Sequence, residues 1–134
     1  MSVRVSESVA RGLSAELQAI TKEAKIDTLA IITTTGARVA FFSKSRADSS
    51  ELSAIAASLI NSGGLASGKL GFGELNDVML RGNNGFLILR MLSERFVLVG
   101  GTKNIQTFTK SASILVAHAA KISEILSDVP EDMY

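Results

Sequence analysis

The chain has 134 residues, of which 46% are hydrophobic and 20% charged, and this composition excludes a disordered protein and a second domain. Its 14 basic and 13 acidic residues leave a formal net charge of +1, so nothing electrostatic favours nucleic acid or an anionic membrane as a partner. The lack of cysteine excludes disulfides and thiol chemistry, and the N-terminus has no apolar segment of signal-peptide length. We therefore expect a single cytoplasmic domain over residues 1–134, without direct insertion into a membrane.

The first predicted element is a helix that begins after Ser6, whose hydroxyl can accept a hydrogen bond from the first turn. Apolar residues then recur at helical spacing, at Val9, Leu13, Leu17, Ile20 and Ala24. Two strands follow, at 28–34 (TLAIITT) and 38–43 (RVAFFS), because β-branched and aromatic residues dominate both segments. Thr35 and Gly36 separate them, which predicts a hairpin.

The second predicted helix carries no charge over most of its length. Asp48 and Glu51 are spaced as in a capping box, and the run 52–68 (LSAIAASLINSGGLASG) has no charged residue. A surface helix usually has a charged side, so we expect the sheet on one side and a second protein chain on the other. The expected sheet side holds Leu52, Ile55, Ala56, Leu59 and Gly63, and the expected free side holds Ser50, Ala54, Ala57, Ser58 and Asn61. Gly63 and Gly64 are expected to end or weaken this helix.

Three further strands are predicted at 75–81 (LNDVMLR), 85–92 (GFLILRML) and 96–100 (FVLVG), joined by tight turns into a meander. The central strands are apolar on both faces, so helices should cover both sides of the sheet. A last helix, capped by Asn104, runs through Leu126, and the acidic tail 128–134 is expected to fray. The fold class is α+β, in the order αββαβββα, with a five-stranded antiparallel sheet.

The residues that could carry chemistry have better structural interpretations. The segment 63–70 (GGLASGKL) departs from a phosphate-binding loop at Leu70, where Ser or Thr should hold magnesium, and it follows a helix instead of opening one. We interpret it as a flexible helix-to-strand connection. His118 is the only histidine, so it has no partner for a typical metal site and is expected to be structural. Glu74 and Asp77 should project to opposite faces of a strand, which disfavours paired acid–base catalysis.

Two other sets of residues are expected to be structural or surface features. Met79 and Met91 are expected in the core. Arg38, Lys44 and Arg46 form a small basic cluster, for which surface solubility is the favoured interpretation and contact with an acidic partner the alternative. We expect no catalytic residue, no cofactor and no metal.

The order of elements resembles the roadblock/dynein-light-chain (Roadblock/LC7) domain, a small module related to the longin and profilin folds. The resemblance covers residues 9–126 and rests on the hairpin TLAIITTTGARVAFFS, the small-residue helix at 48–62, and VMLRGNNGFLILRMLSERFVLVGGT before the last helix. It implies a homodimer in which the strand at 75–81 pairs with its twin into one continuous sheet. The two central helices would then lie side by side, which would explain the missing charges.

The resemblance also implies a function, a non-enzymatic platform that binds and regulates a Ras-like small GTPase. A profilin-like domain that binds a small ligand or acts as a sensor is the alternative, and an enzyme ranks lowest. Arg46 is the expected charge contact with the GTPase. The expected dimer-interface residues are Ala54, Ala57, Ser58, Asn61, Asp77, Val78, Met79 and Leu80.

We predict that the isolated protein does not bind ATP or GTP specifically, because Leu70 cannot ligate magnesium and the segment 63–69 does not open a helix. Titration calorimetry with each magnesium nucleotide should give no saturable heat. Saturable binding that Lys69→Ala abolishes would contradict this prediction.

Overall fold

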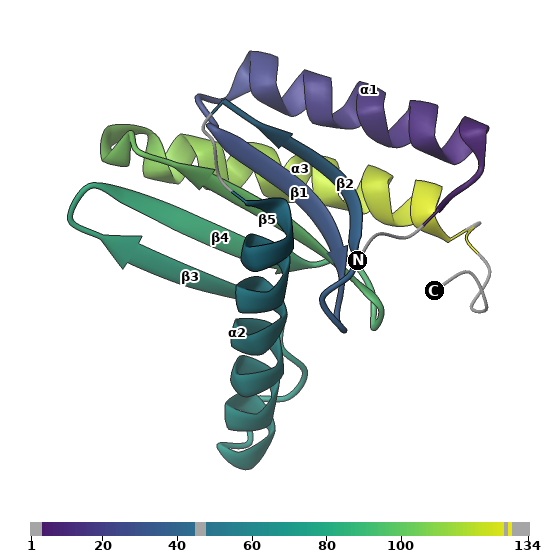
Figure 1. Cartoon of the computed structure of the whole chain (residues 1–134). Helices are drawn as coiled ribbons and strands as arrows, with labels where there is room; N and C mark the ends of the chain where they lie inside the picture. Colours follow the sequence, from purple (N-terminus) through teal and green to yellow (C-terminus); the bar gives the residue numbers. More distant parts are fainter. Residues whose placement is uncertain (1–3, 45–47, 128, 130–134) are drawn as a thin grey trace.

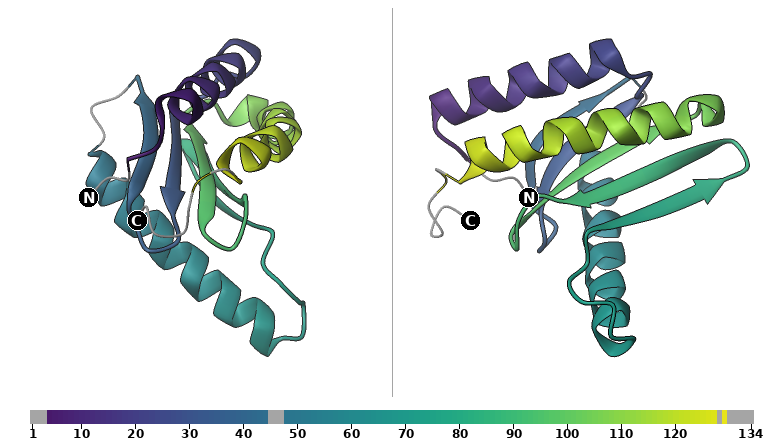
Figure 2. Two further views of the ribbon diagram at one scale, coloured as in Figure 1. Left: turned by 90° about the vertical axis from the view of Figure 1, so that its right-hand side faces the viewer. Right: turned by 180° about the vertical axis from the view of Figure 1, so that it is seen from behind.

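The computed structural model describes residues 4–44, 48–127 and 129, and it shows an antiparallel sheet with helices on both faces (Figures 1 and 2). The elements are α1 (Glu7–Glu23), β1 (Thr28–Thr33), β2 (Arg38–Ser43), α2 (Ser49–Lys69), β3 (Asp77–Gly82), β4 (Gly85–Met91), β5 (Phe96–Thr102), the 3-10 turn η1 (Ile105–Thr107) and α3 (Phe108–Leu126). The strand order is β2-β1-β5-β4-β3, so β2 and β3 form the edges. The predicted α+β class and element order are confirmed. No described helix is long and apolar enough to cross a membrane.

Helices α1 and α3 lie side by side over one face of the sheet (Figure 2). The N-cap prediction for α1 is confirmed, because the Ser6 hydroxyl accepts a hydrogen bond of 3.3 Å from the Val9 amide. At Gly100 of β5, an added Cβ would lie 2.7 Å from Cδ1 of Leu115, so glycine lets α3 pack directly on the strand. The central strand β5 is buried over its whole length. The larger of the two hydrophobic clusters lies on this face and includes Leu13, Ile20, Ile31, Leu98 and Ile122.

Helix α2 alone crosses the other face, where a smaller cluster joins Ala56 and Ile60 to side chains of β1, β4 and β5. Asp48 caps the helix as predicted, because its Oδ1 accepts hydrogen bonds from the amides of Ser50 (2.9 Å) and Glu51 (3.3 Å). The C-terminal half of α2 extends beyond the sheet (Figures 1 and 2). This arrangement leaves much of its surface without a partner among the described residues.

Of the two expected effects of Gly63 and Gly64, ending α2 or weakening it, the first is wrong, because the helix continues to Lys69. A Cβ at Gly63 would lie 3.1 Å from Cγ2 of Val78 and 3.3 Å from Cδ2 of Leu75. Glycine therefore lets the helix approach β3 closely, and this packing offsets a helix-propensity cost of about 1 kcal/mol. The segment 63–69 is consequently helical, not the flexible connection that we expected.

Three smaller expectations also need correction or fall outside the described residues. Asn104 accepts a hydrogen bond from the Gln106 amide, but it starts the turn η1, and Thr107 is the N-cap of α3. Met79 lies on the edge strand and is 53% exposed, so its expected core position is wrong. Met91 packs against the smaller cluster, as expected. The tail 128–134, apart from Val129, lies outside the described residues.

A polar cluster joins the two helices of the larger layer. Oε2 of the buried Glu16 in α1 lies 2.7 Å from Nδ1 of His118 in α3, and its Oε1 lies 3.3 Å from Nζ of Lys121. The other ring nitrogen of His118 lies 3.3 Å from Oε1 of Glu23. Burial alone would raise the pKa of the Glu16 carboxyl, but hydrogen bonds from His118 and Lys121, with their charges, leave that pKa below its usual value. His118 thus holds α3 to α1.

The lowered pKa of Glu16 predicts a loss of stability in acid. A carboxyl with a lower pKa in the folded chain stabilises the fold above its ordinary pKa of 4.5, and this contribution disappears as pH falls through the lowered value. Thermal unfolding followed by circular dichroism should therefore show a steeper acid loss in wild type than in Glu16→Gln. At pH 7 the variant should lose about 2 kcal/mol of unfolding free energy. The control Glu124→Gln, at an exposed position on α3, should keep the wild-type profile, and identical acid slopes for wild type and Glu16→Gln would contradict the prediction.

Candidate interaction surface

The outer edge of β3 is open. Among the described residues, β3 has one hydrogen-bonded neighbour, β4, and the register places Met79 opposite Ile88 and Leu80 opposite Leu87. Ile88 belongs to the cluster under α1 and α3, whereas Leu87 packs with the α2 cluster, so Met79 and Leu80 project to opposite faces. Met79 is 53% exposed and Leu80 49% exposed. An open edge that carries apolar side chains is a template for pairing with another strand.

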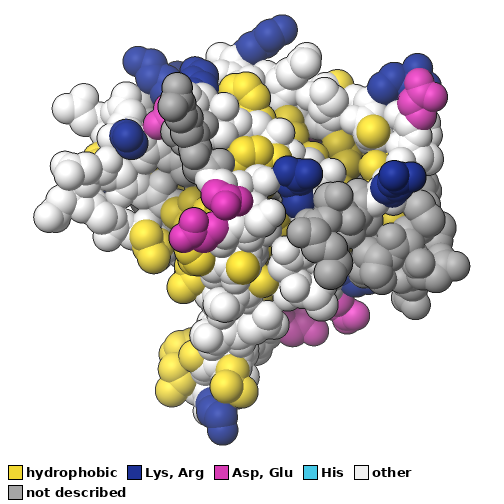
Figure 3. Space-filling view, viewed as in Figure 1, with side chains coloured by type: hydrophobic (Ala, Val, Ile, Leu, Met, Phe, Trp, Pro, Cys, Tyr) yellow, Lys and Arg dark blue, Asp and Glu magenta, His cyan; other side chains and the backbone are white. Residues whose placement is uncertain are grey.

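The side of α2 that faces away from the sheet is uncharged and partly apolar. Ala54, Ser58 and Leu65 are exposed on it, and Ile55 is 49% exposed on the flank. Figure 3 shows hydrophobic side chains beside α2 and at its projecting tip. This side of α2 also leads toward the edge strand. Ile55, Leu59 and Gly63 are four residues apart, so they lie in one row along the helix. At the end of that row, Gly63 packs against Val78 of β3.

The structure corrects the expected orientation of α2. Ile55 was expected on the sheet side, but half of it is exposed, and Ala57 was expected on the free side, but only 6% of it is exposed. A Cβ at Gly36, in the β1–β2 turn, would lie 3.7 Å from Cβ of Ala57, so Ala57 packs inside the protomer. Ser53 and Ala56 are also buried, and Ala56 packs with the smaller cluster on the sheet. Ala57 is therefore buried within the protomer and is not on the free side of the helix.

The other expected interface residues are placed differently from one another. Ala54, Ser58, Met79 and Leu80 are exposed in the protomer. Asn61 is exposed, but its amide donates hydrogen bonds to the carbonyls of Thr34 (3.1 Å) and Ala57 (2.8 Å).

Asp77 and Val78 are half-buried and already have partners in the protomer. Asp77 forms an ion pair of 3.0 Å with Arg90 of β4, and Val78 packs toward Gly63. Glu74 is exposed in the loop before β3, so the expectation that it lies in the strand with Asp77 is wrong. Arg46, the expected charge contact, lies outside the described residues.

A shallow apolar hollow lies between α2 and the β3–β4 hairpin, which extends beyond the helix (Figure 1). Its volume is about 630 Å³, and its lining includes the apolar side chains of Leu52, Leu80 and Leu87. The sequence pattern gives no sign of this hollow, because it exists only where the hairpin extends beyond the helix. It joins the surface of α2 to that of β3. No group of His, Cys, Asp or Glu in the described part of the chain is arranged to hold a metal ion.

Comparison with solved structures finds the same fold in MglB proteins. MglB of Myxococcus xanthus superposes with a TM-score of 0.86 at 16% identity, covering 98% of this chain and 99% of that chain. The gliding protein MglB of Thermus thermophilus gives 0.84 at 14% identity, with 96% and 98% covered. An MglB with a tetrameric arrangement gives 0.85 at 15% identity, with 95% and 96% covered. At these identities the likeness shows the fold alone.

No curated protein sequence matches the chain. The sequence model of the Roadblock/LC7 domain, in contrast, matches residues 14–101, a span that runs from α1 into β5. It includes the hairpin, the uncharged helix and the meander on which the resemblance rests. The chain therefore belongs to the Roadblock/LC7 domain family.

Proposed function

We propose that this protein is a non-enzymatic homodimeric platform that binds and regulates a Ras-like small GTPase. Membership of the Roadblock/LC7 family supports the GTPase part of the proposal, because the resemblance to this family implied that role. The observation that carries the homodimer is the open, apolar edge of β3 next to the uncharged side of α2.

In the proposed dimer, β3 pairs antiparallel with its twin and the two α2 helices lie side by side. A two-fold contact of this kind places the same residues on both sides, so an uncharged helix avoids repulsion between identical charges. Strand pairing would satisfy the outer backbone groups of β3, and the contact would cover Ile55, Met79 and Leu80. One of the similar structures is an MglB with a tetrameric arrangement, so self-association occurs in a protein of this fold.

The dimer supplies the GTPase with a surface that neither protomer has alone. If this surface spans the two-fold axis, one GTPase binds per dimer, since a second copy would overlap the first. The contact should tolerate moderate salt, because the net charge of +1 leaves a limited role for long-range attraction. Arg46 remains our proposed charge contact with an acidic side of the GTPase.

The alternative is a profilin-like domain that binds a small ligand, and the apolar hollow beside Leu52, Leu80 and Leu87 is where that ligand would sit. The hollow is continuous with the open strand edge, which favours contact with a second chain over enclosure of a small molecule. Oligomeric state separates the two functions, because the ligand-binding alternative does not require a dimer.

We predict that the wild type is a dimer and that Ile55→Glu is a monomer. Light scattering behind a sizing column should give twice the 14.1 kDa chain mass for the wild type at micromolar concentration. Two like charges in a dry contact cost on the order of several kcal/mol, so the variant should dissociate. The matched control is Val116→Glu, on α3 across the sheet, because Val116 is 46% exposed and Ile55 49% exposed. A monomeric wild type, or an unchanged mass for Ile55→Glu, would contradict the proposed interface.

We also predict that the dimer binds a Ras-like GTPase of the source organism. Each small GTPase would be immobilised with GDP and with a GTP analogue, and wild type, Ile55→Glu and Val116→Glu would be passed over it. The wild type and Val116→Glu should bind one of these proteins, and Ile55→Glu should not, because the monomer lacks the composite surface. The platform fails as a proposal if no GTPase binds in either nucleotide state, and equal binding by Ile55→Glu would refute the composite surface.

A further inference from the structure

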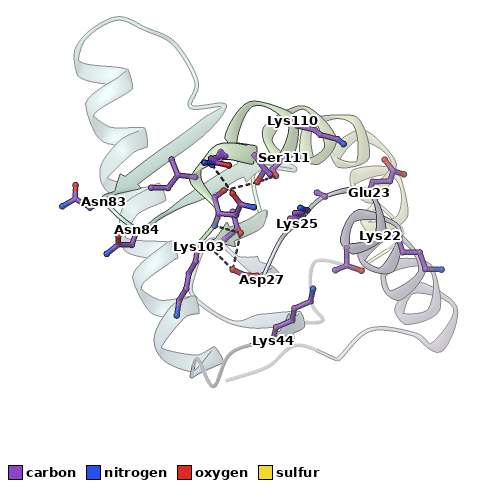
Figure 4. Close-up of a pocket in the computed structure, with 17 residues that line it drawn as sticks. Lys22, Glu23, Lys25, Asp27, Lys44, Asn83, Asn84, Lys103, Lys110 and Ser111 are labelled. Carbon is purple, nitrogen blue, oxygen red and sulfur yellow. Dashed lines mark hydrogen bonds between the residues drawn. The ribbon is translucent and has the colours of Figure 1, made fainter.

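An open basin of about 1110 Å³ lies where the end of α1 and the start of α3 meet the loops that follow β2 and β5 (Figure 4). Five lysines line it, and they come from four separate segments of the chain: Lys22 and Lys25, Lys44, Lys103, and Lys110. The sequence contains seven lysines and seven arginines. The basin thus gathers five of the seven lysines and none of the arginines that the structure describes.

The two carboxylates of the basin already have partners. Oδ2 of Asp27 accepts hydrogen bonds from the Thr102 hydroxyl (3.2 Å) and from the Lys103 amide (2.8 Å). Figure 4 shows Lys25, Lys44 and Lys103 around this aspartate. Oε1 of Glu23 lies 3.3 Å from Nε2 of His118. Both carboxylates therefore form hydrogen bonds within the protomer.

The five lysines are free to meet a ligand. All five are exposed, and none forms an ion pair with another described residue. Five ammonium groups against two carboxylates give the described lining of the basin a formal charge of +3, whereas the whole chain has +1. The basin is therefore more positive than the rest of the molecule, and no described carboxylate forms an ion pair with its lysines.

The chemistry of the lining restricts the class of anion. Lysine is a flexible point charge that lacks the fixed fork of arginine, and the five lysines lie on separate segments, so the basin suits several separate anionic groups better than one compact anion. None of the described residues that line it is aromatic, which leaves no platform for stacking nucleic-acid bases. The side chains of Asn83, Asn84 and Gln106 add hydrogen-bond donors and acceptors that suit a peptide backbone.

The shape of the basin favours a peptide over a membrane surface as its ligand. A flat bilayer touches the rim of a hollow, whereas an extended chain can enter it. The apolar residues of the lining, Ala24 and Ile105, offer little for insertion among lipid chains. We propose that this basin binds an acidic peptide segment, rich in Asp and Glu, of a protein partner. The basin adjoins the apolar hollow, and Lys44 and Lys103 line both. It contains none of Ile55, Met79 and Leu80 of the proposed dimer contact, so the two proposals can fail separately.

The test measures binding of a fluorescein-labelled Glu-rich decapeptide to the full chain by fluorescence anisotropy, with a Gln-rich decapeptide for comparison. One variant combines Lys25→Gln, Lys44→Gln and Lys103→Gln. Its control combines Arg4→Gln, Arg11→Gln and Lys69→Gln, which removes the same charge outside the basin. All six side chains are exposed, so both variants should melt close to the wild type.

The wild type should bind the acidic peptide saturably and more weakly as salt rises. The basin variant should bind about tenfold more weakly, which corresponds to the loss of three exposed ion pairs. The control variant should stay within about twofold of the wild type, since screening weakens charges outside the basin. Absence of saturable binding, or an equal loss in both variants, would overturn the proposal. So would lysine-dependent sedimentation with phosphatidylserine vesicles when the peptide does not bind, because the ligand would then be a lipid surface.

Discussion

The close packing of α2 on the sheet is the constraint on which the rest of the molecule depends. Small residues make it possible: Ser53, Ala56 and Ala57 are buried beneath the helix, and Gly63 leaves room for Val78. Bulkier side chains at these positions would lift the helix from β3. Only a narrow side of α2 is buried against the sheet. The uncharged opposite side of the helix therefore remains at the surface, next to the open edge of β3. The same packing thus shapes both the core of the protomer and the surface through which we propose that it dimerises.

The burial of side chains decreases from the centre of the sheet to its edge at β3. The buried centre is the scaffold, and the exposed edge belongs to the proposed contact surface. The central strand β5 is buried at every position, whereas β3 is half-buried at its start and exposed from Met79 onward. Helices α1 and α3 cover the central strands, and the Glu16–His118 pair links these two helices. The β3–β4 hairpin continues past α2, so Leu80 and Leu87 line a hollow instead of a core. A change at this edge would therefore disturb few of the contacts that stabilise the centre.

Periodicity was sufficient to predict the order of elements, since the core residues of α1 and the central strands follow regular spacing. It failed for the orientation of α2, because alanine, serine and glycine occur on every side of that helix and no apolar stripe dominates. Ile55 was consequently assigned to the sheet side and Ala57 to the free side, whereas Ala57 is buried and Ile55 is half exposed. The continuation of α2 through Gly63 depends on contacts with Leu75 and Val78, which local propensity does not contain. Alternation likewise placed Met79 in a strand but could not show that the strand is an edge.

The sequence pattern could not predict the lysine basin, for a related reason. Its lysines are spread from residue 22 to residue 110, and only the topology brings them together. A net charge of +1 suggested that electrostatics has little influence on partner choice, but this average hides a basin of +3 and a long uncharged helix side. Salt screens the interaction between exposed charges beyond about 10 Å, so a ligand inside the basin would be close enough for strong attraction by its lysines. A chain that packs on the uncharged side of α2 would respond chiefly to shape and apolar contact. The two proposed surfaces would therefore select partners by different physical means, although they belong to one small domain.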